Sequence, residues 1–253
     1  MTWLRRAALG LTALALAACS GAAPPPGGPV DRLSGREGGR IALATTSPYD
    51  FHEAAEAPGA VVWGTLRFPE PGTPVRGAAV LSHGAGGPGA RQERAAARLA
   101  EAGVATLALD HFGPREIGST VRDQLRVTAQ MMLADAAAAR NLLATHPEIA
   151  AADIGLIGWS KGGITATLAA VERLAAYMGL AAPPPAFAIA FYPFCGFDLD
   201  SERVHAPLLY LLGEADDWTP PGPCLRQKAA WAGAGAPVDA QVYADAPHGF
   251  DSR

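Results

Sequence analysis

The segment 158–162 reads Gly-Trp-Ser-Lys-Gly and places Ser160 in a Gly-x-Ser-x-Gly pattern. An apolar run over residues 153–159 precedes this serine, and an alanine-rich helical pattern over 161–178 follows it. This order predicts a nucleophile on a sharp strand-to-helix turn, where flanking glycines leave room for a strained backbone. A serine that only begins a helix can match the same five letters, so the assignment depends on the partners of Ser160.

A serine hydroxyl becomes nucleophilic when a base removes its proton, and one of the six histidines must supply that base. His248 directly follows the last predicted strand, at the sheet edge where a site is expected. His205 precedes a strand and His52 lies in an irregular early segment. We expect His146 to be a helix C-terminal cap or a surface residue. Position therefore favours His248 as the base.

The imidazole of a catalytic histidine needs a buried carboxylate that fixes its tautomer and stabilises its charged form. Glu214, Asp216 and Asp217 follow the predicted strand 207–213. We choose Asp216 with Asp217 as the alternative, and we expect the unused aspartate to lie in a solvated loop. Serine, acid and histidine then follow one another in the chain order of the α/β-hydrolase triad.

The oxyanion that forms during acyl transfer needs two N–H donors. The backbone of Lys161, directly after the nucleophile, is the first candidate. The second is expected from Ala85, in the glycine-rich loop Ser-His-Gly-Ala-Gly-Gly-Pro-Gly that begins at Ser82. His83 is then expected to brace this loop. Such a loop could also bind phosphate, but no Walker lysine follows within it.

Eight short apolar segments, alternating with helical patterns after the second, could position these residues. The predicted strands cover residues 40–46, 60–68, 77–83, 104–110, 153–159, 186–192, 207–213 and 238–244. Helices are expected near 90–102, 119–146, 161–178 and 222–233. The alternation predicts an α/β fold with a mostly parallel eight-stranded sheet and helices on both faces. Residues 60–68 alternate in polarity, as an outer antiparallel strand does, and Ser119 or Thr120 can cap the long helix.

From about Arg40 onward the chain resembles the dienelactone hydrolase family of α/β hydrolases. The matching segments read SHGAGG, DHFGPRE, GWSKGG, GEADDWTP and APHGF. The family's Gly-x-x-Asp-x-x-x-Pro context favours Asp216 over Asp217. The resemblance also implies that Arg115 binds a substrate carboxylate, with a surface loop cation as the alternative. It implies a hydrolase of small esters or lactones that needs no cofactor and no metal.

The chain departs from the family pattern in three places. Ser160 replaces the cysteine nucleophile of the founding enzymes, and the loop at Ser82 lacks their glutamate. Both departures favour a broader carboxylesterase over a dienelactone hydrolase. The family usually continues into a helix after the histidine, so we expect His248 to lie near a loosely held terminus. A non-catalytic scaffold with this fold and a serine peptidase remain alternatives.

The beginning of the chain indicates export. A basic start, an apolar run over residues 7–18 and Cys19 resemble the signal peptide and lipobox of bacterial lipoproteins. We predict a lipid anchor on Cys19 in the cell envelope, on the periplasmic side, although an Ala-x-Ala cleavage site is the alternative. The apolar run is too short to span a bilayer. Residues 20–39 are expected to form a flexible spacer before a single domain over 40–253.

Export permits a disulfide between Cys195 and Cys224, with two separate buried thiols as the alternative. The composition, with 49% hydrophobic and 17% charged residues, indicates a globular protein. The net charge is −4 and no Lys/Arg run follows the first residues. We therefore expect no nucleic acid as a partner.

Overall fold

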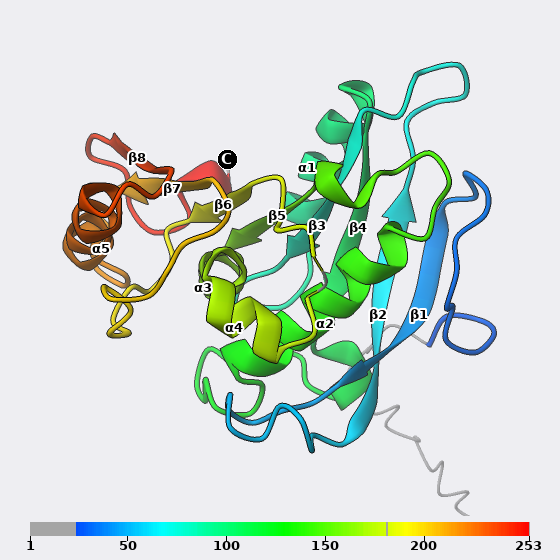
Figure 1. Ribbon diagram of the computed structural model, residues 1–253, viewed down its shortest axis with the longest axis horizontal. Coiled ribbons are helices and arrows are strands. Elements are labelled where there is room, and N and C mark those ends of the chain that lie inside the picture. Colours follow the sequence, from blue (N-terminus) through cyan, green and yellow to red (C-terminus); the bar gives the residue numbers. More distant parts are fainter. Residues whose placement is uncertain (1–23, 181, 253) are drawn as a thin grey trace, which may run out of the picture.

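The structure, a computed structural model that describes residues 24–180 and 182–252, contains one eight-stranded sheet in the order β1-β2-β4-β3-β5-β6-β7-β8 (Figure 1). The strands are β1 (Gly39–Thr46), β2 (Gly59–Arg67), β3 (Gly77–Ser82), β4 (Val104–Asp110), β5 (Ile154–Trp159), β6 (Ala188–Phe191), β7 (Leu208–Gly213) and β8 (Val238–Tyr243). β2 pairs antiparallel with both β1 and β4. The other neighbouring pairs in this order, β4-β3, β3-β5, β5-β6, β6-β7 and β7-β8, are parallel. The predicted mostly parallel sheet is confirmed.

Helices cover both faces of the sheet, as Figure 1 shows. They are α1 (Ala90–Glu101), α2 (Ala129–Leu143), α3 (Lys161–Ala170), α4 (Glu172–Tyr177) and α5 (Pro221–Gly233). Alternate residues of the fully buried β3 enter two different cores: Ala78 and Val80 pack with α2 and α3, while Ala79 and Leu81 pack with α1. Burial on both faces explains why the central strands read as continuous apolar runs.

The long helix predicted over 119–146 is shorter than expected. α2 begins after Thr128, whose Oγ1 accepts a hydrogen bond from the N–H of Met131 at 3.2 Å. The preceding residues are bound to the glycine-rich loop instead: Thr120 N–H and Ser119 Oγ both donate to the carbonyl of Ala85, at 2.8 Å and 3.0 Å. The predicted cap at Ser119 or Thr120 is therefore wrong, because their polar groups bind another loop.

The helix predicted over 161–178 is divided at Val171. This residue has an extended backbone (φ −88°, ψ 115°) and forms an isolated antiparallel bridge with Val204. The N–H of Glu172 donates to the carbonyl of Arg203 at 2.9 Å, so a neighbouring segment satisfies the backbone where the helix stops. Two shorter helices, α3 and α4, result.

The spacer predicted over residues 20–39 is wrong for its second half, which packs on the domain. Leu33 is buried, and its N–H donates to Thr145 Oγ1 at 2.9 Å. Arg36 forms an ion pair with Glu148. Cys19 and the predicted signal segment lie outside the described residues. Within the described ones, no helix combines the length and the apolar character that crossing a bilayer requires.

Candidate active site

Ser160 lies on a strained turn between β5 and α3. Its backbone angles (φ 53°, ψ −112°) are unusual for a residue with a side chain. Glycine is required on both sides: a Cβ on Gly158 would lie 1.8 Å from the carbonyl oxygen of Gly162, and one on Gly162 would lie 2.1 Å from that of Ser82. The turn therefore has the tight packing that the sequence predicts for a nucleophile.

The three predicted triad residues lie together at the carboxyl ends of the strands. His248 Nε2 is 3.1 Å from Ser160 Oγ, and His248 Nδ1 is 2.8 Å from Asp216 Oδ2. The side chain of Asp216 is 1% exposed, whereas Asp217 is exposed to solvent. Asp216 Oδ1 also accepts hydrogen bonds from the N–H groups of Trp218 and Thr219, which fix its orientation. The structure thus selects Asp216 from the two predicted aspartates.

Thr219 is a fourth member of this group that the sequence reasoning missed. Its Oγ1 lies 2.9 Å from Asp216 Oδ2, 3.0 Å from His248 Nδ1 and 3.0 Å from the carbonyl of Tyr192. The hydroxyl can donate to the carboxylate or to this carbonyl, and its oxygen faces the Nδ1–H. An aspartate followed three residues later by a threonine is a turn signal that could have pointed to it.

The segment after His248 is tightly held, contrary to the expected loose terminus. Asp251 accepts hydrogen bonds from Trp159 Nε1 at 2.8 Å and from the Tyr192 hydroxyl at 2.6 Å, and it pairs with Arg91. The Tyr192 ring lies 4.6 Å from the His248 ring. Burial and the neighbouring Asp251 raise the pKa of Tyr192, so its hydroxyl remains a donor. Asp251 thereby connects the histidine segment to the residue before the nucleophile.

Both predicted oxyanion residues line the cavity of Ser160. Ala85 and Lys161 lie on its wall. A Cβ on Gly84 would lie only 3.3 Å from the Cβ of Ser160, so the glycine allows the loop to approach the nucleophile closely.

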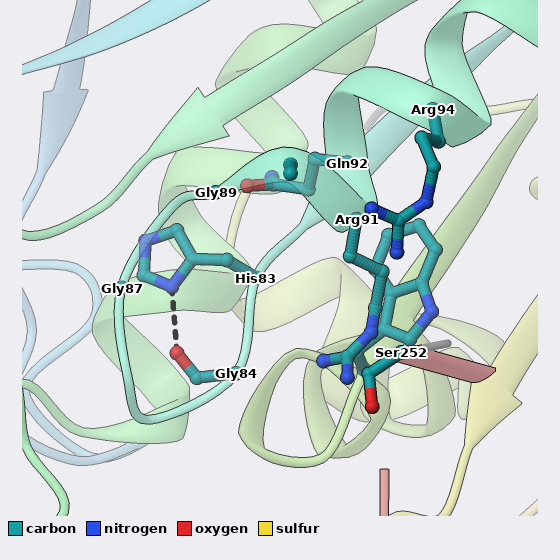
Figure 2. A pocket seen from close by; sticks show the side chains of 10 residues that line it. His83, Gly84, Gly87, Gly89, Arg91, Gln92, Arg94 and Ser252 are labelled. Atoms are coloured by element: carbon teal, nitrogen blue, oxygen red, sulfur yellow. Dashed lines mark hydrogen bonds between the residues drawn. The ribbon is translucent and has the colours of Figure 1, made fainter. Parts of the chain in front are cut away.

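The ring of His83 lies inside the curve of the glycine-rich loop and bonds the carbonyl of Gly84 at 2.7 Å (Figure 2). Its other nitrogen accepts the N–H of His111 at 3.1 Å. Burial, together with the nearby His111, lowers the pKa of His83 to about 3, so the ring is neutral. Both nitrogens are used within the fold, which agrees with the predicted bracing role.

The cavity beside Ser160 has a volume of about 560 Å³. Its apolar lining comes from distant parts of the chain: Tyr49, Leu125, Ile164, Phe194, Phe197 and Trp218. Cys195 and Cys224 form the predicted disulfide, which is confirmed. It joins the segment that carries Phe194 and Phe197 to α5.

The side chain of Lys161 turns away from bulk solvent. The residue is 5% exposed, and its Nζ donates to Thr120 Oγ1 at 3.3 Å and to the carbonyl of Gln124. Burial lowers the pKa of Lys161 to about 8. Residues 119–126 are thus held against the nucleophile turn, and Gln124 and Leu125 reach the cavity wall.

Arg115, which the family resemblance implies as a substrate residue, is bound within the fold. Its two terminal nitrogens contact both oxygens of the buried Asp135, at 2.8 Å and 3.1 Å, and one of them also donates to the carbonyl of His111. Burial would raise the pKa of Asp135, but Arg115 and the hydrogen bonds from His111 and Arg115 hold it below its ordinary value. The alternative, a surface loop cation, is wrong, because the Arg115 side chain is only 13% exposed. We assign Arg115 to the fold.

The same cluster contains a second serine–histidine–aspartate arrangement. His111 Nδ1 is 2.9 Å from Asp135 Oδ2, and His111 Nε2 is 3.2 Å from Ser82 Oγ. All three residues are buried. Ser82 ends β3 and His111 follows β4, so this group lies beneath the glycine-rich loop.

The remaining three histidines are not part of either serine–histidine–aspartate group. His146 is buried against Phe68 and accepts the N–H of Glu148, so the predicted surface or capping role is wrong. His205 contacts the carbonyl of Ala169, and His52 is exposed. In the described residues, no group of three or more His, Cys, Asp or Glu side chains could hold a metal ion.

Comparison with known families now adds to this geometry. The profile of the dienelactone hydrolase family matches residues 71–253. The chain belongs to the dienelactone hydrolase family. Membership confirms the resemblance and makes the protein a hydrolase of carboxylic esters or lactones. A search among curated proteins finds no significant match.

Solved structures with the same fold include esterases. Esterase 2 from Thermogutta terrifontis aligns with a TM-score of 0.57 and 20% identity, over 75% of this chain and 79% of that chain. A protein described as a dienelactone hydrolase, from Klebsiella pneumoniae subsp. pneumoniae MGH 78578, aligns with a TM-score of 0.60 and 21% identity, over 85% and 90%. The Thermogutta enzyme has also been solved phosphorylated by paraoxon. These similarities establish the α/β-hydrolase fold.

Proposed function

We propose that this member of the family cleaves carboxylic esters or lactones through an acyl-enzyme on Ser160. Ser160 Oγ attacks the carbonyl carbon while His248 Nε2 takes the hydroxyl proton, and Asp216 stabilises the imidazolium. The N–H groups of Ala85 and Lys161 stabilise the oxyanion. When the C–O bond breaks, His248 returns the proton to the leaving alcohol. Water, activated by His248, then cleaves the acyl-enzyme and regenerates the serine.

One observation carries the proposal: a strained serine lies on the wall of an accessible cavity and within hydrogen-bond distance of a histidine–aspartate pair. A strained backbone at a nucleophile beside a cavity is characteristic of a functional site, because the surrounding structure must maintain it. A non-catalytic scaffold would have no need for this strain.

A fluorophosphonate probe and p-nitrophenyl butyrate test the proposal on the purified protein. We expect one equivalent of label on wild type, mapped by peptide mass to Ser160, together with butyrate hydrolysis. Ser160→Ala should lose both. Ser82→Ala, which removes the serine of the buried second group, should keep both. A folded wild-type protein that takes up no label and cleaves no ester would instead be a scaffold.

We further propose that the enzyme is exported and anchored in the bacterial envelope by lipid on Cys19, on the periplasmic side. The lipobox-like sequence supports this, and so does the disulfide, because such bonds persist in oxidising compartments. In membrane fractions of expressing bacteria, wild type should be retained and Cys19→Ser should be released. Equal partitioning of the two proteins would contradict the anchor.

A further inference from the structure

The cavity beside Ser160 has a mainly apolar lining. Phe194, Phe197, Trp218 and Leu125 line it and are all at least 40% exposed although they are large and hydrophobic. Exposed apolar side chains that gather around one opening indicate a surface that an apolar ligand covers. The part of the substrate that enters here must therefore be mainly hydrocarbon.

Within the described part of the chain, the cavity wall also offers no cation that is available to a substrate carboxylate. Arg115 does not line it, because both oxygens of Asp135 bind its guanidinium. Among the described residues, Lys161 is the only basic side chain on the wall, and its ammonium group donates to Thr120 and Gln124. An anion bound in this cavity would lose its hydration without gaining an ion pair.

The acidic side chain on the wall works against anions as well. Asp50 lines the cavity, and its Oδ1 accepts hydrogen bonds from the N–H groups of His52 and Glu53. A substrate carboxylate in the cavity would therefore face a like charge.

From this lining we infer that the enzyme selects esters whose cavity-binding part is uncharged and apolar, and that it rejects esters with a carboxylate there. The inference rests on the proposed catalytic role of Ser160. The specificity determinants are the aromatic residues Phe194, Phe197 and Trp218, together with the sequestration of Arg115 by Asp135.

Two matched pairs of esters test the inference on wild type, because either the acyl or the alcohol part can occupy the cavity. The acyl pair is p-nitrophenyl hexanoate and the mono-p-nitrophenyl ester of adipic acid, which have acyl chains of equal carbon number. The alcohol pair is para-acetoxybenzamide and para-acetoxybenzoate. Rates are divided by those of hydroxide hydrolysis to remove differences in intrinsic reactivity. We expect kcat/KM to favour the neutral member about 100-fold in at least one pair.

Substitutions at Phe194 separate charge from loss of apolar surface. Phe194 is half-exposed, so its replacement should not unfold the protein. Phe194→Arg adds a cation at the cavity, and Phe194→Gln is the uncharged control. Relative to Phe194→Gln, we expect Phe194→Arg to raise the anionic-to-neutral ratio of kcat/KM about tenfold for the pair that wild type discriminates.

The outcomes distinguish the inference from the proposed function beneath it. If Ser160→Ala abolishes hydrolysis of the neutral esters but wild type cleaves anionic and neutral members equally well, the specificity inference is overturned and the mechanism stands. The specificity inference is also overturned if Phe194→Arg and Phe194→Gln have the same anionic-to-neutral ratio of kcat/KM. An added cation on the cavity wall should attract a substrate carboxylate that binds there. If wild type cleaves neither pair and takes up no fluorophosphonate, the proposed function itself fails.

Discussion

The protein contains two serine–histidine–aspartate groups with nearly equal distances. In the first, His248 lies 2.8 Å from the aspartate and 3.1 Å from the serine; in the second, His111 lies 2.9 Å and 3.2 Å from its partners. The first borders a cavity, whereas the second is buried beneath a loop. Distances between these three residue types therefore do not identify a catalytic site.

Two further differences separate the groups. Ser160 has a strained backbone between glycines, but Ser82 is an ordinary strand residue of β3. Asp135 is shared between His111 and Arg115, while Asp216 receives backbone N–H groups and Thr219. The arginine already neutralises Asp135, which leaves less of its charge to stabilise an imidazolium. We expect access, backbone strain and a carboxylate that no arginine shares to distinguish a reactive group from a structural one.

The largest expected contrast is between the two histidines. His248→Asn keeps a polar side chain but removes the base, so kcat for p-nitrophenyl butyrate should fall about 10⁵-fold. His111→Asn should leave kcat of the folded protein within about twofold and lower the free energy of unfolding by about 2 kcal/mol. Steady-state kinetics and urea unfolding measure both. A large fall in kcat for a fully folded His111→Asn would show that the second group takes part in catalysis.

Substitutions of Asp216 and Asp135 should differ in the same way: the first should mainly lower kcat and the second should mainly lower stability, with somewhat smaller effects than for the histidines. Asp216→Asn should lower kcat about 10⁴-fold, because the amide cannot stabilise the imidazolium. Asp135→Asn leaves Arg115 partly buried without its counter-charge and should cost about 3 kcal/mol of stability. Thermal unfolding and kinetics on both variants test this. Equal losses of stability in the two variants would contradict the distinction.

The proposed catalytic group could be predicted from the sequence because local motifs mark its members. Gly-x-Ser-x-Gly specifies the turn at Ser160, and the positions of Asp216 and His248 after apolar strands place them at one sheet edge. No comparable signal marks Ser82, His111 and Asp135, which come from three elements and meet only in the folded chain. The family resemblance implied that Arg115 binds substrate. Nothing in the sequence points to its partner Asp135, which lies twenty residues away on α2.

Strands were located to within about two residues, but helix boundaries were less predictable. Continuous apolar runs mark strands buried on both faces. Helix ends depend on which group takes up the backbone donors, and this is a tertiary property. Ser119 and Thr120 read as caps, yet the carbonyl of Ala85 binds them. Val171 stops α3 because a distant segment bridges to it at Val204.

His83, which touches the buried group, should make the protein sensitive to acid. The pKa of His83 is about 3 in the folded protein, against an ordinary value of 6.5. Between these values the unfolded chain binds a proton that the folded protein does not. The stability that neutral His83 contributes is thus fully present above pH 6.5. It is lost progressively as the pH falls from 6.5 toward about 3.

As the pH falls below 6.5, His83 should lower the free energy of unfolding by about 1.4 kcal/mol per pH unit. Urea unfolding across this pH range measures it. His83→Gln, which can still donate to Gly84 and accept from His111, does not titrate there and should show a slope shallower by that amount. Identical slopes for the two proteins would assign the acid sensitivity to other groups.

The smallest expected effect concerns Thr219, which has no counterpart in the Ser82 group. Thr219→Val keeps the shape but removes the hydroxyl that lies between Asp216 and His248. We expect kcat to fall about tenfold with little change in KM, because the imidazole is less well oriented in the transition state. Thr219→Ser retains the hydroxyl and should restore most of the rate. The pH dependence of kcat should shift in the valine variant alone, since loss of a residue that merely packed against the loop would not change the pH profile. If valine and serine give the same rate and profile, the hydroxyl has no positioning role, and the two groups differ only in access, backbone strain and the sharing of their carboxylates.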